Sequence, residues 1–157
     1  MNEFLFDAPS EQDTDRLGAA LAELLAPGTV VSLCGTLGAG KTRLVQAIAS
    51  ALGVDRKEVT SPTFVLMQRY EGTLPIYHLD AYRLRDDDEF LELGPEEFFD
   101  GPGITLIEWG DKVRACLPRE HLEVQIEVLG DHARRFRVRA VGQRYAGVVD
   151  RLASHKP

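Results

Sequence analysis

Eight consecutive residues, Gly35 to Thr42, have the types and spacing of a phosphate-binding loop. They match the pattern G-x-x-x-x-G-K-[ST] at every fixed position. The glycines allow backbone N–H groups to turn toward phosphate oxygens, because no Cβ stands in the way. Lys41 is placed to reach the β- and γ-phosphates, and the hydroxyl of Thr42 is placed to ligate Mg²⁺. The residues expected to contact the nucleotide here are Leu37, Gly38, Ala39, Gly40, Lys41 and Thr42.

The segments on either side of this loop support the same interpretation. Residues 29–34 form a short, nearly continuous apolar run, which is typical of a strand buried on both faces in a parallel sheet. Apolar residues then recur at helical spacing from Leu44 to Leu52, and such a helix would point its positive end at the same phosphates. The alternative is a simple glycine turn with an exposed lysine, which does not account for a strand before the loop and a helix after it.

Two acidic residues are candidates for holding the metal and for the hydrolytic step. Glu108 follows the apolar run 104–107, which is the hydrophobic-run-then-acid pattern of a Walker B strand, and Asp80 follows the apolar run 76–79. In an open α/β sheet, ligands gather outside the carboxyl ends of strands, so both carboxylates could reach the loop. The alternative for each is a solvated acid after a strand.

Four other features allow both a functional and a structural interpretation. The segment Thr60-Ser61-Pro62-Thr63 is either a switch-like loop that senses the γ-phosphate or an ordinary turn. Trp109 is expected mainly to pack, and His78 to be packed or hydrogen-bonded rather than catalytic. The basic run 134–139 alternates in part, so one face should be solvated, with a nucleotide or RNA contact as the alternative.

The remaining pattern predicts an α/β fold in a single domain over residues 1–157. Helices interleave with buried strands, and antiparallel hairpins are attached. We expect a P-loop NTPase-like, three-layer arrangement with a mostly parallel central sheet. The expected helices are 12–26, 44–52, one opening at 86–89, and 145–153; the expected strands are 29–34, 64–70, 75–80, 104–108, 121–129 and 134–141.

Composition limits the partners. The 18 basic and 25 acidic residues give a net charge of −7, so tight binding to DNA or RNA through phosphate neutralisation alone is not expected. No apolar run is long enough to cross a bilayer, and the start of the chain lacks the bases of a secretory signal. With only two cysteines, the sequence favours a reducing cytoplasm over a disulfide framework.

The nucleotide is expected to be ATP or ADP rather than a guanine nucleotide. None of the four lysines lies in the Asn-Lys-x-Asp signature with which GTPases recognise guanine. A small-metabolite or nucleoside kinase is an alternative, although no segment is clearly an Arg-bearing lid. A nucleotide-binding switch that hydrolyses little is a third hypothesis.

Four motifs together resemble the bacterial TsaE family, the ATPase of tRNA N6-threonylcarbamoyladenosine (t6A) biosynthesis. They are LGAGKT at 37–42, SPTF at 61–64, HLDAYRL at 78–84 and LIEW at 106–109. The opening Glu11-Gln12-x-Thr14 and the short length also agree. The resemblance departs at Thr36, where the family commonly has an acid, and at Arg43, where it commonly has a hydroxyl residue. Arg43 could therefore alter nucleotide contacts or a partner surface.

The resemblance implies a slow ATPase that works with the TsaB–TsaD pair, in which TsaD modifies adenosine 37 of tRNA. The ATPase would reset that complex between turnovers, and tRNA would be reached only through it. Carried over by motif, Thr42 and Glu108 would hold Mg²⁺, Lys41 would bind phosphate, and Asp80 would be needed for hydrolysis. Glu11 matches the opening segment near which the family contacts nucleotide.

Overall fold

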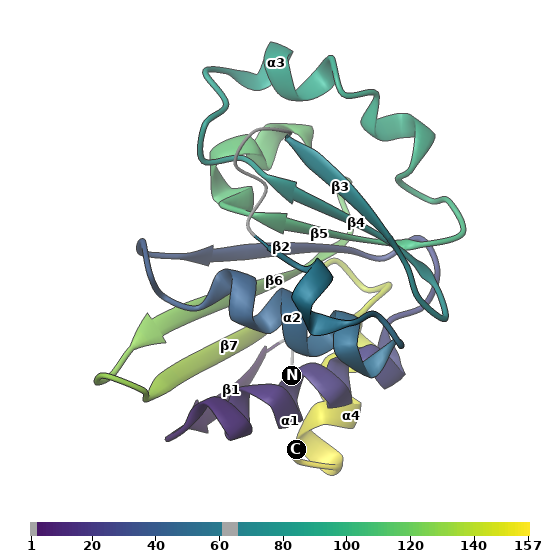
Figure 1. Ribbon diagram of the computed structural model, residues 1–157. Helices are drawn as coiled ribbons and strands as arrows, with labels where there is room; N and C mark the ends of the chain where they lie inside the picture. Colours follow the sequence, from purple (N-terminus) through teal and green to yellow (C-terminus); the bar gives the residue numbers. More distant parts are fainter. Residues whose placement is uncertain (1–2, 61–65) are drawn as a thin grey trace.

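In the computed structural model, the described residues, 3–60 and 66–157, form a seven-stranded sheet with helices on both faces (Figure 1). The strands are β1 (Glu3–Ala8), β2 (Val30–Gly35), β3 (Met67–Glu71), β4 (Pro75–Asp80), β5 (Ile104–Glu108), β6 (His121–Val128) and β7 (Arg134–Val141). The helices are α1 (Glu11–Leu24), α2 (Lys41–Ala51), α3 (Asp87–Leu91) and α4 (Ala146–Ser154). Short 3₁₀ helices follow at Arg56–Glu58 (η1), Pro95–Glu97 (η2) and Gly110–Cys116 (η3). No helix in the described ranges is both long and apolar enough to span a membrane.

The strand order is β1-β7-β6-β2-β5-β4-β3. The four central strands β6, β2, β5 and β4 run parallel, whereas β1, β7 and β3 pair antiparallel at the two ends. The predicted α/β class and both predicted hairpins are confirmed. The central part of the sheet is parallel, as predicted, and the sheet as a whole is mixed because the hairpin partners and β1 extend it with antiparallel strands at both ends.

The edge strand β1 was missing from the sequence prediction. It pairs with β7 in a register that sets Glu3 opposite Arg139 and Asp7 opposite Arg135. Its polar side chains therefore lie beside basic ones on the exposed face, and Phe4 is buried on the other face. This pairing joins segments at opposite ends of the chain; the local signal was the alternation of Phe4, Phe6 and Ala8 with Glu3, Leu5 and Asp7, which the prediction did not use.

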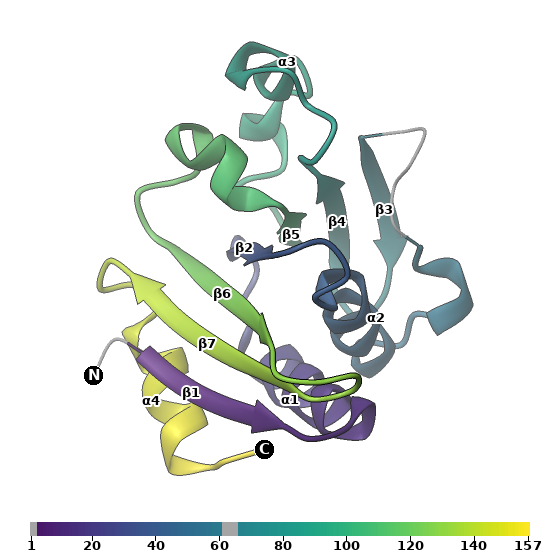
Figure 2. The ribbon, with the colours of Figure 1, turned by 90° about the vertical axis from the view of Figure 1, so that its left-hand side faces the viewer.

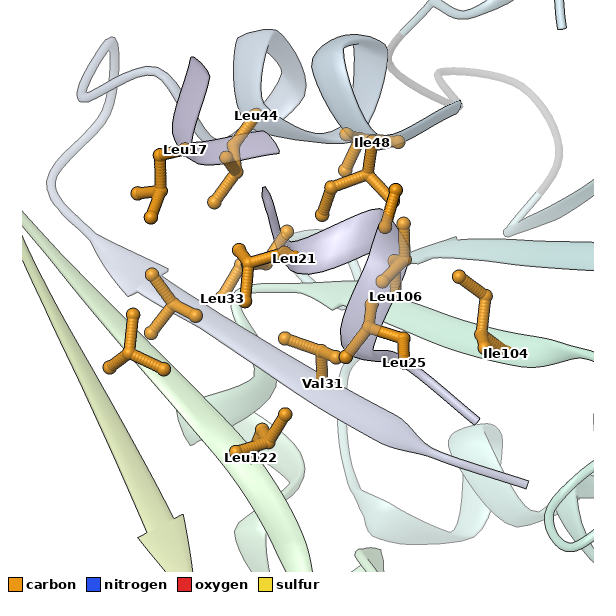
Figure 3. Close-up of a cluster of buried hydrophobic side chains, with 14 of the residues drawn as sticks. Leu17, Leu21, Leu25, Val31, Leu33, Leu44, Ile48, Ile104, Leu106 and Leu122 are labelled. Carbon is orange, nitrogen blue, oxygen red and sulfur yellow. The ribbon is translucent and has the colours of Figure 1, made fainter. Parts of the chain in front are cut away.

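Two apolar clusters fill the two faces of the sheet. The larger lies under α1 and α2, where Leu17, Leu21, Leu44 and Ile48 pack over β2, β5 and β6 (Figure 3). The end of this cluster under β1 and β7 is closed by α4. The smaller cluster lies on the opposite face, where the segment after β4 and η3 covers β4 and β5 (Figure 2). Because β2 and β5 are buried on both faces, the positions of their carboxyl ends are fixed by packing.

Candidate nucleotide-binding site

The loop 35–42 connects the carboxyl end of β2 to the first turn of α2, as predicted. Gly40 caps the helix with φ +108° and Gly38 has φ +77°, which are left-handed conformations that glycine adopts without a Cβ penalty. A Cβ on Gly35 would lie 2.8 Å from the carbonyl oxygen of Ile126, so this glycine also allows close approach to β6. The loop therefore has the backbone shape that the sequence motif required.

Lys41 is almost completely buried within its own loop, at 4% exposure. Its Nζ donates hydrogen bonds to the carbonyl oxygens of Gly35 (2.7 Å) and Thr36 (2.8 Å) and lies 3.9 Å from the centre of the Trp109 ring. Burial lowers the pKa of the Lys41 ammonium, and the charges of Glu108 and Asp111 oppose that shift. The ammonium is thus held at the centre of the loop by carbonyl oxygens and an aromatic face.

Thr42 and Glu108 contact one another directly across the ends of two neighbouring strands. The Thr42 hydroxyl lies 2.8 Å from Oε1 and 2.9 Å from Oε2 of Glu108. β5 runs parallel to β2, with Glu108 in register with Leu33, and this pairing brings the carboxylate beside the loop. Glu108 is only 4% exposed, so its carboxylate is held in a defined position.

A hydroxyl and a carboxylate are hard oxygen ligands, which suit Mg²⁺. In the described ranges, no three His, Cys, Asp or Glu side chains form a metal-binding group. A cation at Thr42 and Glu108 would therefore need further oxygens from a phosphate or water, which is how Mg²⁺ is usually held beside nucleotides. The residues present fit that ion.

Asp80 ends β4, the strand next to β5, and is in register with Glu108. It lines the same hollow as Lys41, Thr42 and Glu108, a space of about 380 Å³. One of its oxygens accepts a hydrogen bond from the backbone N–H of Tyr82 at 2.9 Å. The structure therefore places Asp80, Glu108 and the whole of loop 37–42 around one cavity.

Trp109 closes one side of this cavity. Its φ of +60° is unusual for a bulky residue, and its backbone N–H donates a hydrogen bond to the carbonyl oxygen of Leu33 at 2.8 Å. The indole packs against Tyr82, with 5.0 Å between ring centres, and covers the Lys41 ammonium. The packing expected from the sequence is confirmed, and the ring also lines the candidate site.

Glu11 lies beside the loop but outside the main cavity. With Gly40, Arg43 and Arg134 it lines a separate small hollow of about 60 Å³. Its carboxylate is 3.3 Å from the Arg43 guanidinium, which also donates to Asp15 at 2.9 Å. Arg43 therefore ties the loop helix α2 to α1.

The basic run on β7 divides into two parts. The three arginines of its exposed face form ion pairs with acids of β1 and β6: Arg135 with Asp7, Arg137 with Glu3, and Arg139 with Glu123. Arg134 instead donates from Nε to the carbonyl oxygen of Ala39 in the loop, at 2.8 Å.

This contact of Arg134 was not predicted, because the two residues lie 95 positions apart.

Of the candidate switch segment only Thr60 belongs to the described residues; 61–63 lie outside them.

Comparisons with known proteins agree with the motifs. The family described as "Threonylcarbamoyl adenosine biosynthesis protein TsaE" matches residues 8–136. The chain belongs to the TsaE family. A TsaE protein of Bacillus subtilis (strain 168) is 37% identical over 156 residues, covering 99% of this chain and 97% of that protein. The TsaE protein of Treponema pallidum (strain Nichols) is 43% identical over 129 residues, covering 82% and 95%.

Among solved structures, the crystal structure of Bacillus subtilis YdiB superimposes with a TM-score of 0.82 at 33% identity. The match covers 99% of this chain and 97% of that one, so it includes the loop and all strands of the sheet. The family resemblance that the four motifs indicated is thereby confirmed. The roles of individual residues in this TsaE-family chain remain predictions.

Proposed function

We propose that this protein is an ATPase subunit of the machinery that forms t6A in tRNA, and that it binds ATP together with Mg²⁺. Membership of the TsaE family supports the place in t6A biosynthesis. The observation that carries the ATPase assignment is the meeting of the Thr42 hydroxyl and the Glu108 carboxylate beside the Lys41 ammonium, at the ends of two parallel strands.

The phosphates of ATP would lie along loop 37–42. The backbone N–H groups of the loop and the positive end of α2 favour negative charge there. Lys41 exchanges its carbonyl partners for phosphate oxygens, to which a cation binds more strongly. The nucleoside end would extend toward the small hollow between Glu11 and Arg43, which adjoins the loop at Gly40.

Thr42 and Glu108 would hold Mg²⁺, which when bound offsets the negative charge of the phosphates. Glu108 accepts the hydrogen bond of the Thr42 hydroxyl, so the side-chain oxygens of the two residues that would bind the ion lie beside one another. We assign Asp80 to the hydrolytic step, because its carboxylate lines the same hollow at the end of the adjacent strand. The Trp109 ring covers the Lys41 ammonium.

We further propose that hydrolysis is coupled to turnover of a TsaB–TsaD complex, which carries out the transfer to tRNA. In this account the protein reaches tRNA only through that complex. The pairing of the β7 arginines with acids of the same sheet face supports this indirect role, because those cations already have partners within the chain.

The test is to measure ATP hydrolysis by the purified protein, alone and with the TsaB–TsaD pair from the same source. We expect slow turnover alone and a clear increase with the pair, which Lys41→Ala abolishes. Turnover that does not respond to the pair would contradict the coupling.

The same assay separates the other hypotheses. Appearance of the γ-phosphate on a small metabolite, rather than as free phosphate, would select the kinase. Nucleotide-dependent binding to the pair with no phosphate release would select a switch without an ATPase cycle. We favour the ATPase, since Asp80 adds a carboxylate to the metal and phosphate ligands in one cavity.

A further inference from the structure

A histidine of the neighbouring strand contacts the candidate metal ligand Glu108. His78 Nε2 lies 2.6 Å from Oε2 of Glu108, and both side chains are buried, at 0% and 5% exposure. The two residues come from adjacent parallel strands, β4 and β5, where His78 is in register with Leu106 and therefore two positions from Glu108. A buried polar pair of this kind is costly unless each group finds a partner.

The hydrogen bond restricts how the Glu108 carboxylate can turn. A carboxylate only accepts hydrogen bonds, so Nε2 carries the hydrogen that is donated to Oε2. The Thr42 hydroxyl contacts the carboxylate on its loop side. Thr42 contacts both carboxylate oxygens, whereas the His78 contact is to Oε2. Oε1 is therefore the oxygen that keeps Thr42 as its partner, at the position where a cation shared by the two residues would lie.

The imidazole is fixed in turn by Tyr70 of the edge strand β3. The Tyr70 hydroxyl lies 2.9 Å from His78 Nδ1, and it also lies 2.7 Å from the acceptor oxygen Oε1 of Gln68. Burial, together with the negative charge of Glu108, raises the pKa of Tyr70 to about 12, so the phenol keeps its hydrogen. Nδ1 and the Tyr70 oxygen lie within hydrogen-bond distance, so this contact at one ring nitrogen and the Glu108 contact at the other together fix the plane of the imidazole.

We propose that His78 is a positioning residue for Glu108, and that Tyr70 fixes the His78 imidazole so that the carboxylate presents Oε1 toward Mg²⁺. This inference rests on the proposed function, since it concerns metal-dependent ATP binding at Thr42 and Glu108. It assigns a role to two buried residues of β3 and β4, outside the phosphate loop. Groups that orient a metal ligand in this way typically change metal affinity by about 10- to 100-fold when removed.

The variants separate a hydrogen-bonding role from a packing role. His78→Gln places an amide nitrogen near the position of Nε2 and can still donate to Glu108, whereas His78→Leu fills space without donating. Tyr70→Phe removes only the hydroxyl that contacts Nδ1. Tyr77→Phe is the matched control, because Tyr77 is a buried neighbour on β4 whose ring stacks on Phe98 at 5.2 Å.

The readout is ATP affinity by isothermal titration calorimetry, with Mg²⁺ and again with EDTA, in proteins whose folding is verified by circular dichroism. The ratio of the two affinities isolates the metal-dependent gain. We expect His78→Leu to reduce this gain by about tenfold and Tyr70→Phe by about threefold, with affinity in EDTA unchanged. His78→Gln should keep most of the gain, and Tyr77→Phe should match the wild type.

Four results would overturn the inference. His78→Leu could keep the full gain, or His78→Gln could lose as much as His78→Leu, which would make the role one of packing alone. If His78→Leu does not fold, a Tyr70→Phe variant that behaves like Tyr77→Phe contradicts the positioning chain. A wild-type protein that binds ATP with no gain from Mg²⁺ would instead refute the metal assignment in the proposed function, and this inference with it.

Discussion

Replacement of Lys41 by alanine tests how the loop recognises phosphate. In the structure the ammonium donates to two carbonyl oxygens and lies against the Trp109 ring. In the complex it would donate instead to charged phosphate oxygens. Lys41→Ala removes the phosphate contacts from the ATP complex and the carbonyl and ring contacts from the protein without ATP. The change in ATP affinity is the difference between the free energies of these two sets of contacts.

The magnitude follows from those contacts. Two hydrogen bonds from an ammonium to phosphate oxygens contribute about 3–6 kcal/mol. Giving up the carbonyl and ring contacts costs roughly 1–2 kcal/mol of this. The net loss of about 2–4 kcal/mol corresponds to roughly a 30- to 1,000-fold weaker affinity for ATP.

Calorimetry with Mg·ATP measures this loss directly, and tryptophan emission gives a second readout because Trp109 is the only tryptophan in the chain. The emission of the wild type should change when ATP draws the ammonium away from the indole. The matched control is Lys57→Ala, which removes the same charge from an exposed position on η1. A folded Lys41→Ala protein that binds ATP as tightly as Lys57→Ala would refute the reasoning.

Three further predictions concern the metal, the packing and acid stability. Glu108→Ala should abolish the increase in ATP affinity that Mg²⁺ provides while leaving affinity in EDTA intact, as measured by calorimetry; retention of the increase would exclude Glu108 as a ligand. Gly18→Ala should lower the free energy of unfolding in urea by about 1–3 kcal/mol, because its Cβ would lie 2.3 Å from that of Ala47. Gly147 on α4 has open space where a Cβ would lie, so Gly147→Ala should instead raise the free energy of unfolding by about 0.4–1 kcal/mol. Equal effects of the two substitutions on stability would argue against the α1–α2 contact. The hydrogen bond from Ser10 lowers the pKa of Asp13, so its stabilisation is present above the ordinary pKa and is lost as pH falls through the lowered value. Urea midpoints of Asp13→Asn should therefore depend less on pH below about pH 4 than those of the wild type, and parallel curves would contradict this.

The parts of the site that the sequence could predict are those determined locally. Gly38 and Gly40 adopt left-handed backbone conformations, and the pattern of glycines marks such positions directly. Glu108 could be found because a buried strand followed by an acid delivers that acid to the edge where the loop lies. These inferences need only the order of residue types along the chain and the rule that ligands gather at the carboxyl ends of parallel strands.

The parts that could not be predicted depend on which strands become neighbours. The contact of His78 with Glu108 requires β4 to lie beside β5, and the contact of Tyr70 with His78 requires β3 to lie beside β4. The edge strand β1 is likewise defined by its partner β7. Sequence reasoning correctly placed His78 in the interior as a hydrogen-bonded residue, yet its partner follows only from the order of the strands.

The most direct test of the central claim is calorimetric titration of the folded wild-type protein with ATP in the presence of Mg²⁺. Saturable binding of one ATP per chain, weakened by Lys41→Ala, is the result that the arrangement of loop 35–42, Thr42 and Glu108 predicts. The absence of any binding to ATP or ADP by a folded preparation would contradict the account.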